Sequence, residues 1–416
     1  MSISRTPSDW RTGTVADICR MQNGHGFGPE DWETAGLPII RIQNLNGGSK
    51  FDYFSGKPES RWLVEPGQLL FAWAGTRGVS FGPTVWHGPL GVLNQHIFKL
   101  EAKEGIDRNW LFWALRHITN RIEGQAHGFK ATLVHVKKSD IDRQPVSIPP
   151  IQEQQRIATA LDTWEEAIRA AERLLTNSRK QKRALIQRVL TGQKRLTSFR
   201  GVARTQPTPH GPIPSDWDYP RIEAFAQEVS TKLGSRSAYP VLSCTKHRGL
   251  VDSLSFFNKQ IFSVDTSTYK VVPRNCFVYA TNHIEEGSIG YQHLHDFGLV
   301  SPMYTVFKTK DKVSDGYLYR LLKTERYRQI FAAATNASIN RRGSLRWNEF
   351  KKLHVPLPSL TEQHAISTLL DTADCEIEFF GKQLALLRVE KSALMEKLLT
   401  GKHRVRQSRS AFETTE

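Results

Sequence analysis

One phrase occurs twice in this chain, and the repetition constrains what the chain can fold into. VSIPPIQEQQRIATALD occupies residues 146–162, and VPLPSLTEQHAISTLLD follows 209 positions later, at residues 355–371. Two shorter motifs also recur: Pro-Ser-Asp-Trp at residues 7–10 and 214–217, and Leu-Thr-Gly at residues 190–192 and 399–401. A repeat spaced this widely predicts two structural modules of ordinary domain size, which have diverged most between the shared motifs.

Each copy of the phrase opens a long segment in which core-type positions are spaced alternately by four and three residues. This a/d pattern continues for more than four heptads and is typical of a coiled coil rather than a surface helix. A helix of about 38 residues would be roughly 57 Å long. The predicted seam consists of Ile157, Leu161, Trp164, Ile168, Leu175, Leu185, Ile366, Leu370, Ile377, Phe380, Leu384 and Leu394.

Two equal helices in one chain are expected to pack on each other. A two-fold relation between the halves would make the pair antiparallel, although the sequence alone leaves a parallel pair open. Both seams place a lysine at the same heptad position, Lys182 and Lys391. A polar residue there can fix the register at some cost in stability, or its stem can extend past the seam into solvent.

The composition favours a polyanionic partner. Lysine and arginine number 57 against 41 acidic residues, which gives a net charge of +16. The positive charge accompanies aromatic residues in segments that read as folded, as in many nucleic-acid-binding proteins. A basic protein without such a partner is the alternative.

Cysteine usage and hydropathy indicate a cytoplasmic protein. The four cysteines are scattered without a CxxC pair, so we expect reduced thiols and no zinc site. No run approaches the roughly 20 apolar residues of a membrane span, and nothing reads as a signal peptide.

Catalytic signatures are largely missing from the sequence. There is no GxxxxGK[ST] phosphate-binding loop, no [DNS]PP[YFW] tetrapeptide of amino-methyltransferases and no HExxH metal motif. We therefore expect a chain that is not an enzyme and holds no metal. Two alternatives stay open: a self-contained DNA methyltransferase or nuclease with unusual motifs, and a coiled-coil scaffold without a DNA role.

The motifs resemble those of the specificity subunit of type I restriction–modification enzymes. The resemblance is carried by Pro149-Pro150-Ile151-Gln152-Glu153-Gln154, by Pro358-Ser359-Leu360-Thr361-Glu362-Gln363, and by the helix that follows each and ends in Leu-Thr-Gly. It covers about residues 1–403. It implies a non-catalytic reader of double-stranded DNA, in which each recognition domain reads one half of a bipartite, asymmetric site. The paired helices would set the length of the unread spacer between the half-sites and dock two modification subunits, and indirectly the restriction subunit. Two modification (methyltransferase) subunits would supply S-adenosylmethionine, and a restriction/translocase subunit would supply ATP- and Mg-dependent cleavage.

Pattern and resemblance together predict an α+β fold. Two pseudo-two-fold-related α/β target-recognition domains are expected to be separated by an antiparallel two-helix coiled coil, because short strand-like runs dominate residues 37–100 and 239–308. The predicted boundaries are recognition domain 1 at 1–148, spacer helix 1 with the start of a linker at 149–198, and the linker at 199–213. Recognition domain 2 follows at 214–355, spacer helix 2 at 356–403 and a flexible tail at 404–416.

Side chains with planar or paired hydrogen-bonding groups are the candidates for reading bases. For each of them, a phosphate contact or a solvated surface position stays open as the alternative. The candidates are Arg41, Gln43, Asn44, Arg77, His127 and Lys130 in the first half, and Lys246, His247, Arg248, Asn282, His283, Asn340, Arg341 and Arg342 in the second.

Overall fold

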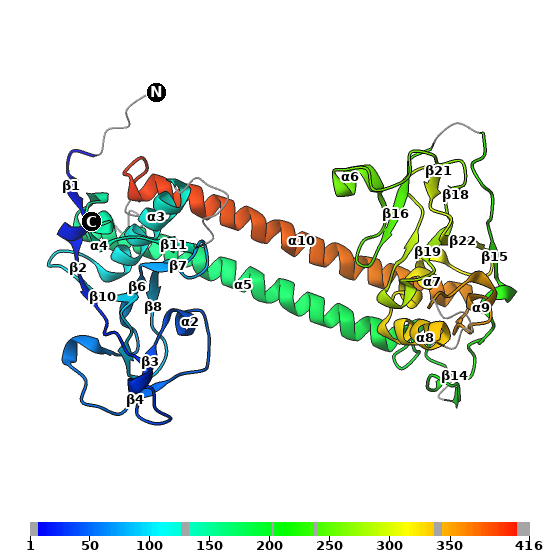
Figure 1. Ribbon diagram of the computed structural model, residues 1–416, viewed down its shortest axis with the longest axis horizontal. Coiled ribbons are helices and arrows are strands. Elements are labelled where there is room, and N and C mark those ends of the chain that lie inside the picture. Colours follow the sequence, from blue (N-terminus) through cyan, green and yellow to red (C-terminus); the bar gives the residue numbers. More distant parts are fainter. Residues whose placement is uncertain (1–6, 126–132, 202–203, 236–238, 337–342, 406–416) are drawn as a thin grey trace, which may run out of the picture. The chain divides into compact units, whose positions relative to one another are not determined.

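The chain folds into two compact units, each of which contains parts of both long helices. The computed structural model describes residues 7–125, 133–201, 204–235, 239–336 and 343–405. The first unit comprises Met1–Arg173 and Lys382–Glu416, and the second comprises Leu174–Gly381. The long helices are α5 (Ile151–Val189) and α10 (Leu360–Leu399), drawn in Figure 1. Among the described residues, no helix is both long and apolar enough to cross a membrane.

The first unit is built around an antiparallel four-stranded sheet in the order β2-β10-β6-β8. A second sheet has the order β4-β3-β9-β5, and two strand pairs, β1-β12 and β11-β7, complete the unit. The strands are β1 (Arg11–Thr14), β2 (Cys19–Asn23), β3 (Leu37–Ile40), β4 (Tyr53–Phe54), β5 (Leu63–Val64), β6 (Leu69–Ala72), β7 (Ala74–Thr76), β8 (Gly82–Val85), β9 (Gly91–Leu93), β10 (Ile97–Ala102), β11 (Leu133–His135) and β12 (Pro145–Ile148). Its helices are α1 (Val15–Ile18), α2 (Ile42–Leu45), α3 (Arg108–Gln125) and α4 (Lys138–Asp142), with 3-10 turns at Pro29–Asp31 and Ser60–Trp62.

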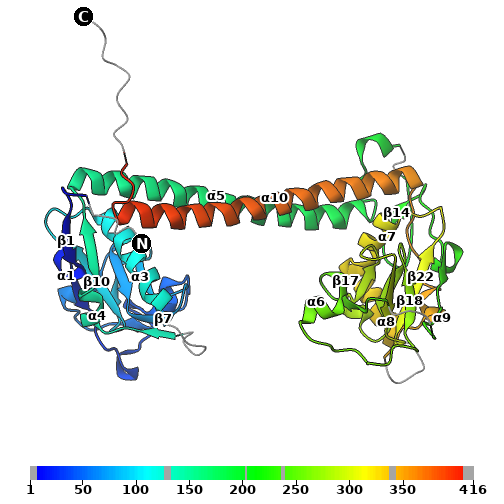
Figure 2. The ribbon, with the colours of Figure 1, turned by 90° about the horizontal axis from the view of Figure 1, so that it is seen from above.

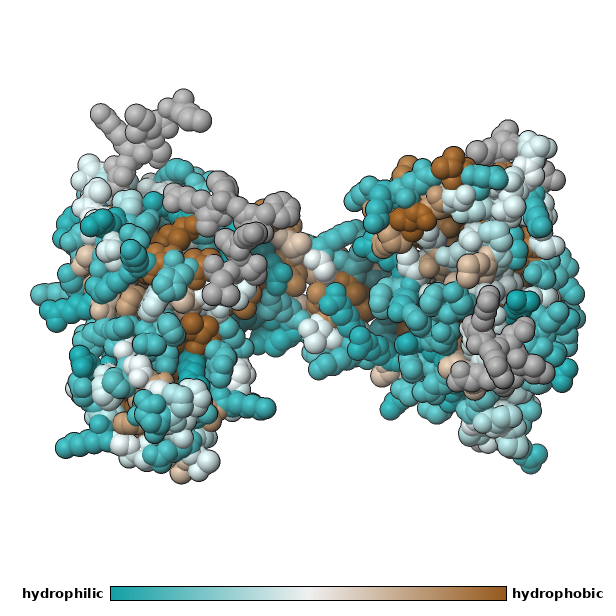
Figure 3. All heavy atoms as spheres, viewed as in Figure 1, coloured by the Kyte–Doolittle hydropathy of each residue, from teal (hydrophilic) through white to brown (hydrophobic). Residues whose placement is uncertain are grey.

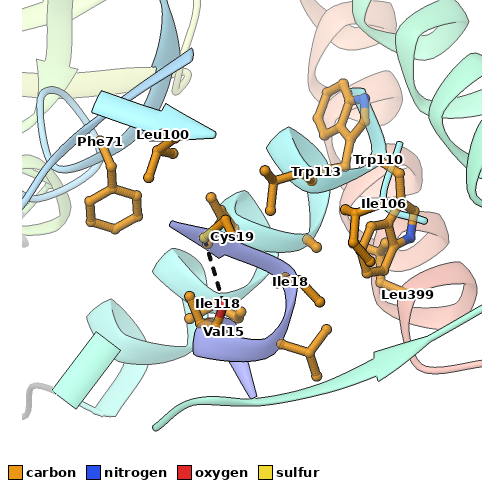
Figure 4. Packing of buried hydrophobic residues seen from close by; sticks show 14 of the residues in the cluster. Val15, Ile18, Cys19, Phe71, Leu100, Ile106, Trp110, Trp113, Ile118 and Leu399 are labelled. Atoms are coloured by element: carbon orange, nitrogen blue, oxygen red, sulfur yellow. Dashed lines mark hydrogen bonds between the residues drawn. The ribbon is translucent and has the colours of Figure 1, made fainter. Parts of the chain in front are cut away.

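The core of the first unit joins this domain to the helices. Trp110 of α3 is fully buried and packs in one cluster with Phe71 of β6. The same cluster includes Leu161 of α5 and Leu399 of α10. Figure 4 shows Leu399 beside Trp110 and Ile106. The start of α5 and the end of α10 are therefore part of the hydrophobic core of this domain rather than appended to it.

The second unit has a sheet of the same design, in the order β15-β22-β19-β20. Its remaining strands form the pairs β16-β17, β18-β21 and β13-β14. The strands are β13 (Thr205–Gln206), β14 (Ile213–Pro214), β15 (Ala226–Glu228), β16 (Leu242–Thr245), β17 (Gly249–Asp252), β18 (Lys270–Pro273), β19 (Phe277–Ala280), β20 (Ile289–Tyr291), β21 (Phe297–Val300) and β22 (Tyr304–Thr309). Its helices are α6 (Ser253–Phe257), α7 (Asp315–Leu322), α8 (Glu325–Asn336) and α9 (Trp347–Phe350), with 3-10 turns at Thr197–Phe199, Ile222–Ala224 and Ile284–Glu286.

The two sheets are equivalent strand by strand. Strands β2, β10, β6 and β8 match β15, β22, β19 and β20 in order along the chain, in order within the sheet and in antiparallel direction. The central strands LLFA (β6) and FVYA (β19) are apolar and buried at every position, which is how a strand covered on both faces reads in sequence. The predicted duplication of a mixed α/β domain is confirmed.

The long helices run antiparallel, as the two-fold relation predicted. In the first unit the start of α5 faces the end of α10, where Lys391 pairs with Glu165. In the second unit the end of α5 faces the start of α10, where Lys182 pairs with Asp374. The two lysines are 209 residues apart, and so are the two carboxylates. Within each unit, Figures 1 and 2 show the two helices side by side.

Both alternatives for the seam lysines apply in part: each stem lies in the seam, and each ammonium group reaches the edge of the helix pair. The side chains of Lys182 and Lys391 are 23% and 18% exposed, so each remains partly in the seam and meets a carboxylate of the opposite helix. Every predicted seam residue is buried or half-buried in the structure. The buried ones are Ile157, Leu161, Ile168, Leu175, Ile366, Leu370 and Leu384, and the half-buried ones are Trp164, Leu185, Ile377, Phe380 and Leu394.

An arginine clamp explains why several short motifs recur together. In the second unit, Arg195 donates two hydrogen bonds to the buried carboxylate of Glu362, at 2.9 and 2.6 Å, and two to Asp216. In the first unit, Arg404 makes the same bonds to Glu153 and Asp9. Each clamp therefore joins the Glu-Gln start of one helix to the end of the other helix and to Pro-Ser-Asp-Trp.

The glycine of each Leu-Thr-Gly lies against the proline of Pro-Ser-Asp-Trp. Gly192 and Gly401 have φ angles of +71° and +73°, a backbone conformation that favours glycine. A Cβ atom at these positions would lie 2.3 Å from Cδ of Pro214 and 2.4 Å from Cδ of Pro7, respectively. These glycines permit both the helix termination and the close contact with the following motif.

The glutamine of each Glu-Gln pair fastens the domain to its own helix. Gln363 is buried, donates to the carbonyl oxygen of Pro358 at 2.9 Å and accepts from the amide of Ser314 at 2.8 Å. Gln154 donates to the carbonyl of Pro149 and accepts from the amide of Asp107. In each Glu-Gln pair, the glutamate therefore binds the arginine that follows the other long helix, and the glutamine binds the backbone of the recognition domain.

We expect Gln363→Ala to lower the free energy of unfolding of the second unit by about 1–3 kcal/mol, because a buried amide and a buried carbonyl lose their partner. Urea unfolding followed by hydrogen exchange measures this. His364→Ala, at the adjacent exposed position, is the matched control and should change it little. Equal effects of the two substitutions would contradict the role assigned to Gln363.

The structure differs from the predicted boundaries in two places. The segment expected to be a plain linker contains the hairpin β13-β14, in which Gln206 donates to the carbonyl oxygen of Trp217. Arg404, expected to begin the flexible tail, belongs to the clamp. Proline, glycine and threonine made residues 199–214 look unstructured, although short polar hairpins have the same composition.

Candidate nucleic-acid interface

Three predicted contacts lie together at the tip of the β16-β17 hairpin. Lys246, His247 and Arg248 are all exposed in the turn between the two strands. Lys323, at the end of α7, donates from Nζ to the carbonyl oxygens of Lys246 and Gly287, both at 2.7 Å. Burial lowers the pKa of Lys323, which here supports the backbone of the tip while the exposed side chains point away from the core.

The 3-10 turn at Ile284–Glu286 brings a further predicted contact to this tip. Glu286 pairs with Lys246 and lies 3.3 Å from Nδ1 of His283, and the hydrogen bond from Lys246 is the main cause that lowers the pKa of Glu286. Asn282 precedes His283 and is half-buried. The structure thus groups Lys246 and His283 around one carboxylate that sequence reasoning missed.

Ligand atoms of His283, Glu285 and Glu286 lie within 4.8 Å of one another, which is close enough to hold a metal ion. Because the ammonium group of Lys246 already neutralises Glu286, we assign no metal to this cluster. Its electrostatic effect is to offset part of the positive charge of the hairpin tip.

In the first domain, the candidates Arg41, Gln43 and Asn44 lie at the short helix α2, where Arg41 is the N-cap. Asn44 is buried: its side chain accepts from the amide of Arg41 and donates to the carbonyl oxygens of Gly48 and Lys50. We correct the prediction for Asn44, because these bonds close the turn after α2 and occupy the groups that a base would need. Gln43 is exposed.

Arg41 is half-buried and already has partners. It forms an ion pair with Asp52 and stacks over the ring of Trp32, with the guanidinium carbon 4.6 Å from the ring centroid. DNA would have to compete with Asp52 for this guanidinium. Arg77 is exposed in a separate turn after β7, which is tied to α3 by a hydrogen bond from the amide of Gly78 to Glu123 at 2.8 Å.

Five predicted contacts lie outside the described residues. They are His127, Lys130, Asn340, Arg341 and Arg342. Both segments that contain them are flanked by described elements in the equivalent place of each domain, after α3 and α8 and before α4 and α9. On the face shown in Figure 3, the surface of both units is mostly hydrophilic, with apolar residues gathered in a few patches.

Sequence comparison identifies one family over most of the chain. The family model described as "Type I restriction modification DNA specificity domain" matches residues 7–177 and 238–387, which places one match on each domain and its helix. The type I restriction enzyme MjaVIII specificity subunit of Methanocaldococcus jannaschii is 24% identical over 97% of this chain and 95% of the relative.

Solved structures with the same fold match nearly the whole chain. The HsdS subunit from Thermoanaerobacter tengcongensis matches 97% of this chain and 99% of its own, with a TM-score of 0.53 and 16% identity. A chain from a structural study of complex assembly and conformational transition in the type I restriction–modification system has a TM-score of 0.59 at 16% identity, over 96% of this chain and all of its own. At these identities the likeness bears on the fold alone.

Proposed function

The chain belongs to the type I restriction–modification DNA specificity family, and on that premise we propose that it is the subunit that reads the DNA target. Each domain reads one half of a bipartite site. The observation that carries this proposal is the pair of sheets with equivalent strand order, in domains that differ in their exposed residues. A duplicated scaffold with diverged surfaces suits two half-sites of different sequence.

The chain is a non-catalytic subunit. The family match disfavours the alternative of a self-contained methyltransferase or nuclease. Two modification subunits would bring S-adenosylmethionine to the complex, and a restriction/translocase subunit would bring ATP and Mg. The free cysteines fit a reducing cytoplasm, where such a complex meets DNA.

The long helices are the platform for the modification subunits. Both helices carry large apolar side chains on exposed faces, which suit burial by a partner. Their exposed fractions are 50% for Leu174, 56% for Phe379, 50% for Leu386 and 67% for Val389.

A mobility-shift titration with the chain, with and without its modification subunits, tests the proposal. We expect the complex to bind a subset of DNA sequences tightly. The logarithm of the affinity should fall linearly with the logarithm of the salt concentration, because counterions are released from the phosphates. S-adenosylmethionine binding by the purified chain alone would contradict the non-catalytic assignment.

A further inference from the structure

One position at the end of the central strand is hydrogen-bonded to the equivalent two chain segments in both domains. In the first domain, strand register pairs Ala72 of β6 with Ile97 of β10. The next residue, Trp73, donates its amide to the carbonyl oxygen of His96 at 3.3 Å, and its own carbonyl accepts from the amide of Val136 at 3.1 Å. Three chain segments therefore meet at Trp73.

In the second domain Thr281 contacts the equivalent two segments, with its hydroxyl in place of the amide that Trp73 uses. Strand register pairs Ala280 of β19 with Tyr304 of β22. The hydroxyl of Thr281 donates to the carbonyl oxygen of Met303 at 2.9 Å, and its carbonyl accepts from the amide of Leu345 at 2.7 Å. Trp73, His96 and Val136 thus have Thr281, Met303 and Leu345 as counterparts. The first residue after each bond also matches, because Lys137 and Arg346 are the N-caps of α4 and α9.

In the second domain this position opens into a polar cleft of about 670 Å³. Asn282, Arg346 and Asn348 line the cleft, and Trp347 forms part of its wall, stacked on Phe307 with ring centroids 5.6 Å apart. Within the described part of the chain, the side chains of Asn282, Arg346 and Asn348 make no hydrogen bond or ion pair. The cleft therefore presents unused donors and acceptors on a rigid aromatic wall.

In the first domain the same position carries aromatic and imidazole rings. The Trp73 ring lies 5.2 Å from the ring of His96 and 4.7 Å from that of His135, between centroids. The indole NH donates to the carbonyl oxygen of Gln95 at 3.1 Å, which fixes the orientation of the ring. Both histidines are exposed. The two domains share the backbone arrangement at this position, but one presents amide and guanidinium groups and the other presents indole and imidazole rings.

We propose that this position is the base-reading site of each domain, formed by Asn282, Arg346 and Asn348 in the second and by Trp73, His96 and His135 in the first. The inference rests on the proposed function and adds the residues that give it specificity. A scaffold that fixes the backbone and leaves the side chains free to differ is what two readers of different half-sites need.

The side chains of the two sites are suited to different bases. Arginine binds O6 and N7 of guanine with two hydrogen bonds, and asparagine binds N6 and N7 of adenine in the same way. The second domain is therefore suited to purines in the major groove. The first domain offers an apolar ring face, which suits the thymine methyl group, and imidazole nitrogens that can donate or accept.

The test is to select binding sites from randomised DNA with the complex of this chain and its modification subunits. Arg346→Ala should lower discrimination at one base pair of one half-site by roughly 5- to 150-fold and leave the other half-site unchanged. Asn282→Ala should act within the same half-site. His96→Ala should act within the opposite one.

Lys312→Ala is the matched control, because it also removes one exposed positive charge from the second domain. It should leave the selected sequence unchanged. If Arg346→Ala weakens binding equally for all sequences, Arg346 contacts a phosphate, and the inference is overturned; an unchanged preference overturns it as well. A wild-type complex that selects no sequence at all would instead refute the proposed function.

Discussion

Replacing Arg195 with alanine should destabilise the second unit by about 3 kcal/mol, because the substitution leaves a buried carboxylate without its partner. The side chains of Arg195 and Glu362 are 11% and 2% exposed. Hydrogen bonds from this guanidinium to Glu362, and then to Asp216, raise the pKa of Arg195 above its ordinary value. Among the described residues, only Arg195 donates to the carboxylate of Glu362. Urea unfolding with hydrogen exchange read separately in the two units measures the loss.

The equivalent substitution in the first unit, Arg404→Ala, should have a smaller effect on stability than Arg195→Ala. Glu153 accepts hydrogen bonds from Arg404 and also from the indole NH of Trp10, at 3.0 Å. The indole nitrogen of Trp217, the counterpart of Trp10, has no such partner. Arg404→Ala should therefore cost less than Arg195→Ala.

A double variant separates the ion pair from simple packing. Arg195→Met combined with Glu362→Met should recover most of the lost stability, because no unpaired charge stays buried. If the double variant is as unstable as Arg195→Ala, or if Arg195→Ala costs less than about 1 kcal/mol, the clamp does not have the energetic role that we assign to it.

Lengthening both long helices by one heptad should lengthen the unread spacer of the DNA site by up to about three base pairs. Seven residues add roughly 10.5 Å of helix, and one base pair rises about 3.4 Å. The insertions belong after Arg173 and after Gly381, where the two units meet in sequence, so that the contacts within each unit are kept. A heptad copied from the preceding seven residues preserves the a/d seam. Mapping of the methylated sites reads out the spacer.

The control for this prediction is a heptad inserted in α5 alone. It should impair assembly, because the paired seam then loses its register. Doubly extended helices that leave the spacer unchanged would contradict the proposal that the paired helices set the spacer length, even if both half-sites were still recognised.

The long-range organisation could be predicted because it has a periodic signal. The four-three spacing of Ile157, Leu161 and their successors is independent of what the helix packs against, and the offset of 209 identified its partner. The antiparallel direction followed from symmetry alone and is confirmed by the pairs Lys391–Glu165 and Lys182–Asp374.

The clamps and the site were harder to predict for a physical reason. Arg195 and Arg404 also recur at an offset of 209, three residues after Leu-Thr-Gly, so a signal was present. Their partners, however, lie on another helix and another motif, which only the fold brings together. Asn44 was misassigned because an asparagine that closes a turn and one that reads a base look alike in sequence.

A domain exchange measured by methylation-site mapping tests the central claim most directly. The second recognition domain, residues 214–355, would be replaced with that of a relative of different specificity, with both long helices and both clamp arginines kept. We expect a bipartite methylated sequence in which one half-site changes, while the other half-site and the spacer length stay the same. A contiguous target, or a change in both half-sites, would contradict the account of two independent readers on a common pair of helices.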